Sequence, residues 1–577
     1  MKKLNLAVLF LISTFPLFAA ERSESEMEAI ALQQLKGAGV KSLANQFAAK
    51  LKCLQRNTAF SIYGTEDNDG FVIVSSDDEV RPVLGYSTSS FDANNIPCGL
   101  QWWMENVSSE IEKVKRAPRQ GKEESLQYVP IAPFLETKWG QDDPYNRLTP
   151  EFDSANGKQH AVTGCVATAL AQILNYNQYP SSASFEGLYY MELSSQKEEI
   201  NSTYEWPCKI AYGNYWPDGY QTQYDWKTIE YTDEEAVQIA TLLRDCGYSV
   251  KMQYGLKASS ASTQYSANAL INCFQYPKAA VKAVDREWYT DTEWMQMVYD
   301  ELMKKSPILY AGQDPVKGAH AFLLHGIDEK GLVYVNWGWV GANDGYYAID
   351  GFSSDAGSFN SNQNMVIGLR PQALSSDMYS SLFMMNEPYV VEWHPEYSTP
   401  LLVSFESCTN SSYDVSPFIG DLAFVAEDQT DGTVILTPYD RIIFSENGCP
   451  YGSGWLDPGN YFKIEFAPNH SYKFYMASKA TDEANYSPIY VARKGSLYYN
   501  VTTDSEGTPT FSEPQYVTTV VRSAKQTETD GIARVYDLQG RLLQSVPATS
   551  ISSWKMPRGL SIVKQGNRVR KIAGRAQ

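Results

Sequence analysis

The stretch TGCVATALAQIL, residues 163–174, decides the fold of this chain. Val166, Leu170 and Ile173 recur at the spacing of one helical face, which predicts a buried helix that begins at or near Cys165. A thiol at a helix N-terminus lies at the positive end of the dipole and beside free N–H groups. These lower its pKa and can hold an oxyanion. A buried cysteine that only packs the helix is the alternative, and this segment alone leaves both open.

The choice of a general base is narrow because the chain has five histidines. They are His160, His320, His325, His394 and His470. The last two lie in a β-rich region, and His160 precedes Cys165 on the same loop rather than across a cleft. His320 and His325 flank the apolar run AFLL, and their odd separation puts them on opposite faces of a regular strand. Small residues before His320 give a ligand room, so we predict that His320 is the base and that His325 is structural or exposed.

A base of this kind needs a partner that orients it. The run YVNWGW, residues 334–339, follows a predicted turn at 328–331, and a hairpin there would return Asn336 and Trp337 beside His320. The Asn336 amide would accept from one imidazole N–H, and the Trp337 ring would shield that bond from water. A buried aromatic strand with a turn asparagine is the alternative, which this run alone does not exclude.

Taken together, these segments resemble the streptopain family of papain-like cysteine peptidases. The resemblance lies in TGCVATALAQILNYNQYP, KGAHAFLLHGID and VYVNWGWVGANDGYYAID, in this order over roughly residues 130 to 371. It implies an α+β papain-like peptidase domain, with Cys165 as nucleophile and His320 as base. It also implies Asn336 and Trp337 as their support.

The same resemblance implies residues that contact substrate. It carries Ser260, in YGLKASSA, onto a substrate-contacting position, and it puts Ala319 beside the base where the family often has Gly. Gln159 lies six residues before Cys165, which is the spacing of the papain-type oxyanion glutamine. No metal or cofactor is expected, since none of the eight cysteines forms a C-x-x-C pair.

The first part of the chain is organised as a secretory precursor. Residues 1–20 have a positive start, an apolar run and two small residues at the end, which indicates a signal peptide. Residues 21–116 mix helix and strand patterns, and the stretch GFVIVSSDDEVRPVLGYS resembles the family's inhibitory prodomain. Residues 117–127 are charged and lack large apolar side chains. We therefore predict an exposed activation linker, followed by the peptidase domain at 128–372.

The second part is β-rich. From 373 to 520, short strand-like runs alternate with Gly, Asn, Asp and Pro turns, which predicts one or two β-sandwich modules. Residues 521–577 end basic, and the runs ARVYDLQGR and MPRGLSIV are similar to C-terminal sorting domains of type IX secretion cargo. An aromatic or β-branched residue usually follows the glycine that is Gly559 here, and this chain has Leu560. Attachment to the cell surface therefore stays open.

Helical periodicity marks four further segments. They are 24–36, 100–115, 233–246 and 292–305.

These features predict a secreted cysteine endopeptidase, made as a zymogen, that acts on protein or peptide substrates and is inhibited by its own prodomain. The net charge of −19 argues against nucleic acid and anionic membranes as main partners, and no membrane span is expected after signal removal. Two other functions stay open. One is a transglutaminase-like acyl transferase, which would have Asp in place of Asn336, and the other is a surface adhesion protein with an inactive papain-like domain. Export permits disulfides, with Cys408 and Cys449 as one candidate pair.

Overall fold

The computed structural model of the chain describes most of its residues. The described ranges are 21–43, 50–115, 128–191, 194–204, 232–278, 280–314, 318–350, 363–372, 383–385, 387–404, 409–410, 419–443, 461–480, 485–517, 532–536, 542–547, 559–565 and 568–574. The chain divides into two compact units, Met1–Gln372 with Ser380–Val520, and Ala373–Tyr379 with Val521–Gln577. The predicted signal peptide at 1–20, the predicted linker at 117–127, and Cys208, Cys408 and Cys449 lie outside the described residues.

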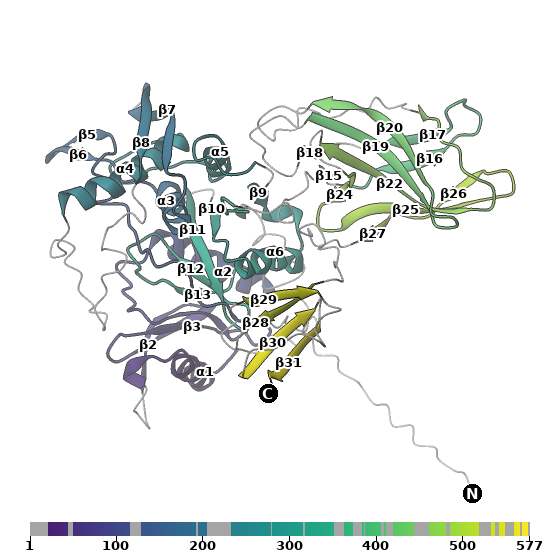
Figure 1. The fold of residues 1–577 in the computed structure, drawn as a ribbon. Helices are drawn as coiled ribbons and strands as arrows, with labels where there is room; N and C mark the ends of the chain where they lie inside the picture. The colour runs from purple at the N-terminus through teal and green to yellow at the C-terminus, as the bar shows by residue number, and fades with distance from the viewer. Residues whose placement is uncertain are drawn as a thin grey trace, which may run out of the picture. The chain divides into compact units, whose positions relative to one another are not determined.

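The first part of the larger unit, purple in Figure 1, packs two helices against antiparallel strands. Its elements are α1 (Glu24–Gly37), β1 (Leu51–Arg56), β2 (Phe60–Thr65), β3 (Phe71–Ser75), β4 (Val83–Ser87) and α2 (Cys98–Val114). A capping box of Ser23 and Glu26 starts α1, and its buried side chains Met27, Ala31 and Leu35 recur every four residues along one face. The helices predicted at 24–36 and 100–115 are confirmed.

The middle part surrounds the helix that the sequence predicts at Cys165. Its helices are α3 (Cys165–Asn177), α4 (Asp233–Ser249), α5 (Gln264–Asn272) and α6 (Asp291–Met303). Its strands are β5 (Glu151–Ser154), β6 (Gly157–His160), β7 (Ser182–Met191), β8 (Ser194–Thr203), β9 (Lys282–Asp285), β10 (Ile308–Asp314), β11 (Gly318–Ile327), β12 (Val333–Asn336), β13 (Gly345–Tyr347) and β14 (Gln363–Ile367). Val166 and Leu170 of α3 share one buried core with Ala321 and Leu323 of β11. This packing holds the start of α3 at β11.

One antiparallel sheet runs through both parts. Its strand order is β1-β2-β3-β4-β13-β12-β11-β10-β14-β9. It becomes continuous where Gly85 and Tyr86 of β4 pair with Tyr347 and Tyr346 of β13. A Cβ at position 85 would come within 2.5 Å of the Tyr347 ring, so glycine lets this ring lie against β4. The first part is thus joined to the middle part by backbone pairing as well as by side chains.

A β-sandwich follows. Its strands are β15 (Phe383–Met385), β16 (Val390–Trp393), β17 (Leu401–Ser404), β18 (Thr409–Asn410), β19 (Ile419–Asp428), β20 (Val434–Ile443), β21 (Tyr461–Phe462), β22 (Ser471–Ala480), β23 (Ser487–Pro488), β24 (Tyr490–Val491), β25 (Gly495–Thr503), β26 (Pro509–Phe511) and β27 (Gln515–Val517). One sheet has the order β18-β15-β24-β25-β22-β19-β20, and the other has the order β16-β17-β21. Leu401 of the second sheet and Phe424 and Phe474 of the first lie in one core, so the two sheets pack face to face. The predicted α+β class with a β-sandwich is confirmed.

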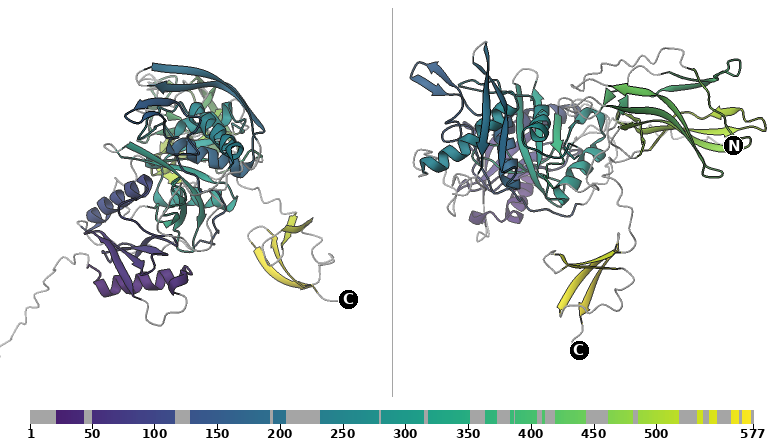
Figure 2. Two further views of the ribbon diagram at one scale, coloured as in Figure 1. Left: turned by 90° about the vertical axis from the view of Figure 1, so that its left-hand side faces the viewer. Right: turned by 45° about the horizontal axis from the view of Figure 1, so that its top comes forward.

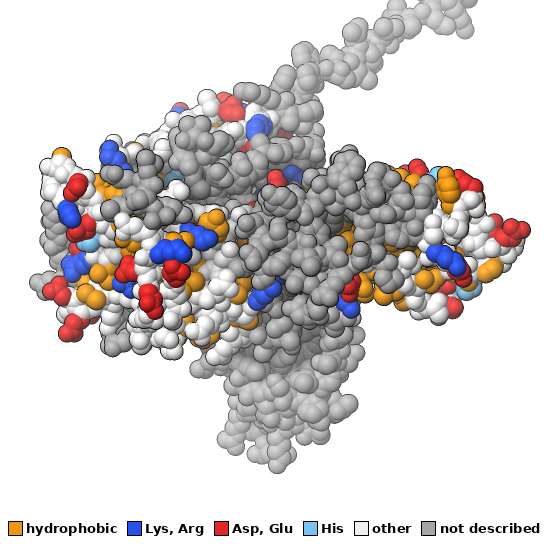
Figure 3. Space-filling model, turned by 90° about the horizontal axis from the view of Figure 1, so that it is seen from above, with side chains coloured by type: hydrophobic (Ala, Val, Ile, Leu, Met, Phe, Trp, Pro, Cys, Tyr) orange, Lys and Arg blue, Asp and Glu red, His pale blue; other side chains and the backbone are white. Residues whose placement is uncertain are grey.

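The smaller unit is a four-stranded antiparallel sheet, yellow in Figure 2. Its strands are β28 (Ile532–Tyr536), β29 (Leu542–Pro547), β30 (Gly559–Gln565) and β31 (Arg568–Gly574), in the order β29-β28-β30-β31. Across the described part of the chain, no helix has both the length and the apolar content needed to cross a membrane. On the face drawn in Figure 3, acidic and basic side chains are interspersed over the described surface.

Candidate active site

Cys165 is the first residue of α3, and it lies next to β11. Gly164 before it has a φ of +87°, and a Cβ there would lie 2.8 Å from Met252 and 3.2 Å from Ser259. Glycine satisfies both this backbone conformation and this close packing. The Ala321 N–H donates to Cys165 Sγ at 3.4 Å. The sulfur is therefore in contact with the residue that follows His320.

Burial raises the pKa of Cys165 above its ordinary value. The N–H groups of Ala321, Val166 and Cys165 itself act in the opposite direction, because they stabilise the thiolate. Burial is the larger of the two effects, so the net shift is upward. Removal of whatever buries the sulfur, with these N–H groups left in place, would lower the pKa.

His320 lies on β11, partly exposed, directly opposite Gly312 of β10. Side chains alternate along a strand, so Phe322 shares the face of His320, and Ala321 and Leu323 point to the other face. The candidate base therefore lies on the opposite face of β11 from the side chains that pack in the core with α3.

Trp337 contacts the same face of the sheet. Its ring centroid lies 4.9 Å from that of Phe322. Its backbone N–H donates to Asp344 Oδ1 at 3.0 Å, and its indole N–H donates to the Asn343 carbonyl at 3.1 Å. The indole is thus fixed against Phe322, two residues along β11 from His320, and its shielding role stays a prediction.

The β11–β12 hairpin forms as expected, but its register places Asn336 away from His320. A bulge between Leu324 and Ile327 shifts the pairing, so that Asn336 lies opposite Leu323. Directly paired residues share a face, so Asn336 points to the side of α3.

The Asn336 amide is bonded on that side. Its Nδ2 donates to the Thr137 carbonyl at 2.8 Å and to Gln172 Oε1 at 3.1 Å, and its Oδ1 accepts the Gly338 N–H at 2.9 Å. Gln172 lies on α3 and also accepts the Trp139 N–H at 3.2 Å. In this state Asn336 connects β12 to α3, and its role as the orienter of His320 stays a prediction.

The two predicted substrate-contacting residues, Ser260 and Ala319, lie on different elements of the middle part. Ser260 is exposed and exchanges backbone hydrogen bonds with Gln253. Its neighbour Ser259 donates to the Val162 carbonyl at 2.7 Å, which joins this loop to the segment before Cys165. Ala319 lies on β11 opposite Gln313. The loop that carries Ser260 therefore borders the nucleophile candidate.

Gln159, the predicted oxyanion residue, is exposed on the β5–β6 hairpin, opposite Phe152. A different glutamine, which the sequence analysis did not consider, lies next to the start of α3. The Gln141 carbonyl accepts the Thr163 N–H at 3.1 Å, and the preceding carbonyl, of Gly140, accepts from Thr168 Oγ1 at 3.3 Å. A search that fixed the glutamine at one spacing from Cys165 could not find Gln141, because the two segments meet only in the fold.

The other histidines of the middle part have structural partners. His325 is buried, and its Nδ1 accepts the N–H groups of Phe134 at 3.2 Å and Leu135 at 3.1 Å. Burial lowers its pKa to about 3. His160 Nδ1 bonds the Thr149 carbonyl at 2.7 Å.

The first part of the chain covers the face of β11 that carries His320. A Cβ at Gly99, the second residue of α2, would lie 2.8 Å from the Trp337 ring. A Cβ at Gly312 would lie 1.8 Å from the Trp102 ring, so this indole fills the space beside His320 where a side chain at 312 would project. α2 therefore lies directly over the candidate base and its shielding ring.

One group of described side chains outside this region could hold a metal ion. Asp428, Asp431 and His470 bring their ligand atoms within 4.8 Å of one another in the β-sandwich. His470 Nδ1 bonds Asp428 Oδ2 at 2.6 Å. Burial alone would raise the pKa of Asp428, but this bond and backbone N–H groups lower it to about 2. The hydrogen bond between Asp428 and His470 explains why these two side chains lie close together.

Comparison with known proteins finds matches for both the middle part of the chain and the part before it. The peptidase C10 family model matches residues 139–347, and the Spi protease inhibitor model matches residues 23–111. Streptopain from Streptococcus pyogenes is 32% identical over 391 residues, which cover 61% of this chain and 92% of streptopain. The chain belongs to the peptidase C10 family.

Two further relatives extend the comparison. The thiol protease/hemagglutinin PrtT of Porphyromonas gingivalis is 30% identical over 56% of this chain and 38% of its own length. A solved fragment of prointerpain A from Prevotella intermedia is 30% identical and covers 56% of this chain and 100% of the fragment, with a TM-score of 0.48. Active interpain A from the same organism is 34% identical over 42% of this chain and 96% of that chain, with a TM-score of 0.34.

Membership of the C10 family makes this chain a cysteine protease synthesised as a zymogen with an inhibitor-like prodomain. The predicted enzyme class is therefore confirmed. Of the two alternatives, neither the acyl transferase nor the inactive adhesion protein is needed to account for the family match.

Proposed function

We propose that this C10 peptidase is a secreted endopeptidase that cleaves protein and peptide substrates with Cys165 as nucleophile and His320 as general base. The observation that carries the assignment is the 3.4 Å contact between Cys165 Sγ and the N–H of Ala321, the residue next to His320. A helix N-terminus supplies the sulfur with N–H groups, and the neighbouring strand supplies an imidazole.

The chemistry follows from these groups. The Cys165 thiolate attacks the scissile carbonyl carbon, and the oxyanion is held by N–H groups at the start of α3. His320, having taken the thiol proton, gives it to the leaving amine. Water then attacks the thioester with His320 as base, which releases the acid and restores the thiol. Gln141 or Gln159 would donate a side-chain N–H to the oxyanion, and the position of the Gln141 loop beside Thr163 favours Gln141.

The prodomain, residues 21–116, acts as an intramolecular inhibitor in this proposal. Trp102 fills the space beside His320, and Gly99 lies against Trp337. A substrate that reaches Cys165 along this face would have to displace α2. Asn343 Nδ2 donates to the Ser90 carbonyl of the prodomain at 2.7 Å. This bond joins the loop that follows Trp337 to the prodomain.

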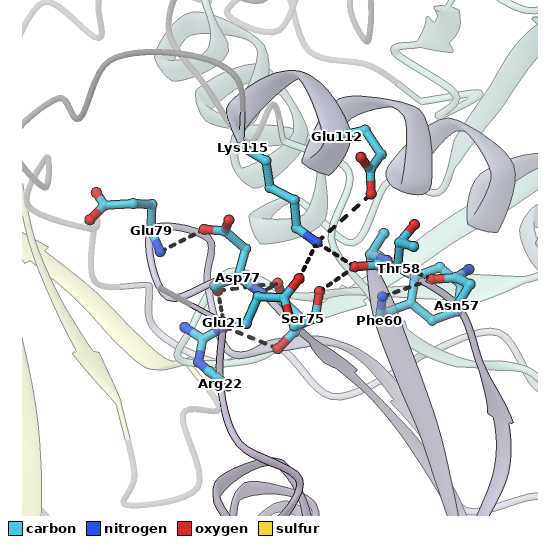
Figure 4. Close-up of polar contacts among 12 residues, drawn as sticks. Glu21, Arg22, Asn57, Thr58, Phe60, Ser75, Asp77, Glu79, Glu112 and Lys115 are labelled. Carbon is cyan, nitrogen blue, oxygen red and sulfur yellow. Dashed lines mark hydrogen bonds and ion pairs between the residues drawn. The ribbon is translucent and has the colours of Figure 1, made fainter. Parts of the chain in front are cut away.

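One cluster of polar contacts holds both ends of the prodomain (Figure 4). Its position determines which cuts would release the prodomain whole. Lys115 Nζ pairs with Glu21 at 3.4 Å and with Glu112 at 3.8 Å, and it donates to the Thr58 carbonyl. Arg22 donates to backbone carbonyls that include that of Val80 at 2.7 Å. A cut in the predicted linker at 117–127 lies beyond this cluster, so it would release a complete prodomain.

The test is hydrolysis of casein and of a fluorogenic peptide by protein cut in the linker. Cys165→Ser should abolish turnover in folded protein, and Cys273→Ser, at the end of α5, should leave it unchanged. Near-normal turnover by the Cys165→Ser variant would contradict the assignment. Secretion is tested separately by N-terminal sequencing of exported protein, which should begin at about Glu21. Association with the cell surface is tested by cell fractionation: if residues 521–577 act as a sorting domain, the protein should be found in the cell-associated fraction.

A further inference from the structure

Two cysteines begin two helices, α2 and α3, that contact β11. Cys98 is the first residue of α2, in the prodomain, and Cys165 is the first residue of α3. The residue after Cys98, Gly99, lies against the rings of Trp337 and Phe322. Cys165 Sγ accepts the N–H of Ala321, the residue before Phe322. Both helices therefore bring their first residue to the same short segment of β11.

The pKa of Cys98 is consistent with this placement. Burial raises the pKa of Cys98 to about 11, and the next largest cause of the rise is the charge of Cys165. The N–H groups of Gly99 and Cys98 act on Cys98 as those of Val166 and Cys165 act on Cys165. Each thiol is thus placed where a helix N-terminus favours thiolate, and burial acts on each in the opposite direction.

Neither cysteine has another covalent partner. Among the described cysteines, Cys53, Cys98, Cys165 and Cys273 form no disulfide. Cys53 is exposed on β1, and Cys273 caps the end of α5, so each offers a comparison for the pair at the site.

We propose that Cys98 and Cys165 form a disulfide when the precursor meets an oxidising environment, so that the prodomain becomes covalently attached to the nucleophile. The proposal rests on the proposed role of Cys165. The oxidant is a low-molecular-weight disulfide. The thiolate of one cysteine attacks it and releases one small thiol, and the second cysteine then displaces the other small thiol. In total two protein thiols lose two electrons and two protons, which the small disulfide takes up as two thiols.

The disulfide would add a second condition to activation. A cut in the linker separates the prodomain from the peptidase along the chain, but the bond would still hold α2 over the site. Activity would then require both a cut and a reducing thiol, which converts the bond back to Cys98 and Cys165. An exported precursor would stay inactive in oxidising surroundings even after an accidental cut.

The experiment uses the full precursor without its signal peptide, treated with oxidised glutathione, alkylated and digested without reduction. Mass spectrometry should find one peptide pair that joins Cys98 to Cys165, lighter than the two free peptides by two hydrogen atoms. The pair should also form in Cys53→Ser and should be absent in Cys98→Ser. Absence of the pair in the wild type, or glutathione attached to either cysteine in its place, would overturn the proposal.

A functional arm separates this proposal from the assignment of the nucleophile. After oxidation and cutting in the linker, the wild type and Cys53→Ser should show no peptide hydrolysis until a reducing thiol is added, and under denaturing, non-reducing conditions their prodomain should stay attached to the peptidase. In Cys98→Ser the prodomain should separate from the cut peptidase under the same conditions, although Cys165 itself can carry glutathione until it is reduced. Separation of the prodomain in oxidised, cut wild type would overturn the latch. Because the cross-link is read by mass, it stands or fails independently of turnover by Cys165→Ser, which tests the nucleophile alone.

Discussion

Gly312 pairs directly with His320 across β10 and β11, and the Trp102 indole of the prodomain fills the space that a side chain at Gly312 would take. The absence of a side chain at one strand position thus lets the inhibitor reach the candidate base. The surfaces of the prodomain and the peptidase are therefore complementary at this point.

Gly312→Ala should weaken the closed state of the precursor. The new Cβ would meet the Trp102 ring at 1.8 Å, and overpacking of this kind costs about 1–3 kcal/mol. Uncut Gly312→Ala precursor should therefore hydrolyse a fluorogenic peptide faster than uncut wild type. Gln101→Ala, on the exposed side of the same helix, should not.

The cause is checked by a double-mutant cycle. Trp102→Ala should itself open the precursor, since loss of a buried Trp costs about 3–5 kcal/mol. It should also remove most of the further effect of Gly312→Ala, because the colliding ring is gone. Effects of the two substitutions that simply add would show that Trp102 and Gly312 are not in contact.

His320 should be the histidine whose loss stops the chemistry. In cut enzyme, His320→Ala should reduce kcat/KM by roughly 10³-fold or more, as expected for removal of a general base. His160→Ala should have little effect, because His160 lies on the β5–β6 hairpin and bonds the Thr149 carbonyl. If His160→Ala were the silent variant and His320→Ala the active one, the base would be misassigned.

The pKa of the Cys165 thiol should fall when the prodomain leaves. In the precursor, burial holds this pKa above its ordinary value of 9.0, so alkylation by iodoacetamide should rise only in strongly alkaline solution. After cutting and prodomain release, the rise should move to lower pH, because the N–H groups of α3 remain. The measurement is the alkylation rate of Cys165 against pH, read by mass spectrometry.

Cys273 provides an internal control for that measurement. Burial within the peptidase raises its pKa to about 11, and this burial does not depend on α2. Its profile should be the same before and after the cut. A Cys165 profile that likewise does not move would mean that the prodomain does not bury the thiol.

His325 should make the stability of the protein fall in acid. Its pKa is lowered to about 3 by burial, whereas an unfolded histidine titrates near 6.5. Below about pH 6.5 the unfolded chain binds a proton that the folded chain does not, so the free energy of unfolding decreases as the pH falls toward about 3. Urea unfolding between about pH 7 and pH 4 should show a larger loss in wild type than in His325→Gln, which can still accept the amides of Phe134 and Leu135. Parallel pH profiles for the two proteins would contradict this.

The local features of the active site could be predicted from sequence. The helix at Cys165 follows from the spacing of Val166, Leu170 and Ile173, and the hairpin of β11 and β12 follows from two apolar runs around a turn. The odd separation of His320 and His325 predicted that they differ in environment, and in the structure one is partly exposed and the other is buried.

Three features of the fold and the site could not be predicted from the sequence. The bulge after Leu324, which turns Asn336 toward α3, leaves no clear pattern in the sequence. The pairing of Tyr86 with Tyr346, which joins the first part of the sheet to the middle part, links segments that are far apart along the chain. The place of Gln141 beside Thr163 is of the same kind. Periodicity and spacing report local neighbours, and the Tyr86–Tyr346 and Gln141–Thr163 contacts join separate segments of the chain.

The central claim is that the prodomain blocks Cys165 until the linker is cut, and site-specific labelling tests it most directly. Precursor, before and after limited cleavage within residues 117–127 under reducing conditions, would be treated with an epoxide inhibitor of cysteine peptidases, and the labelled residue mapped by mass spectrometry. The account predicts almost no label before the cut and one label per molecule afterwards, on Cys165, with none in Cys165→Ser. Equal labelling of Cys165 in the uncut precursor, or labelling of another cysteine after the cut, would contradict it.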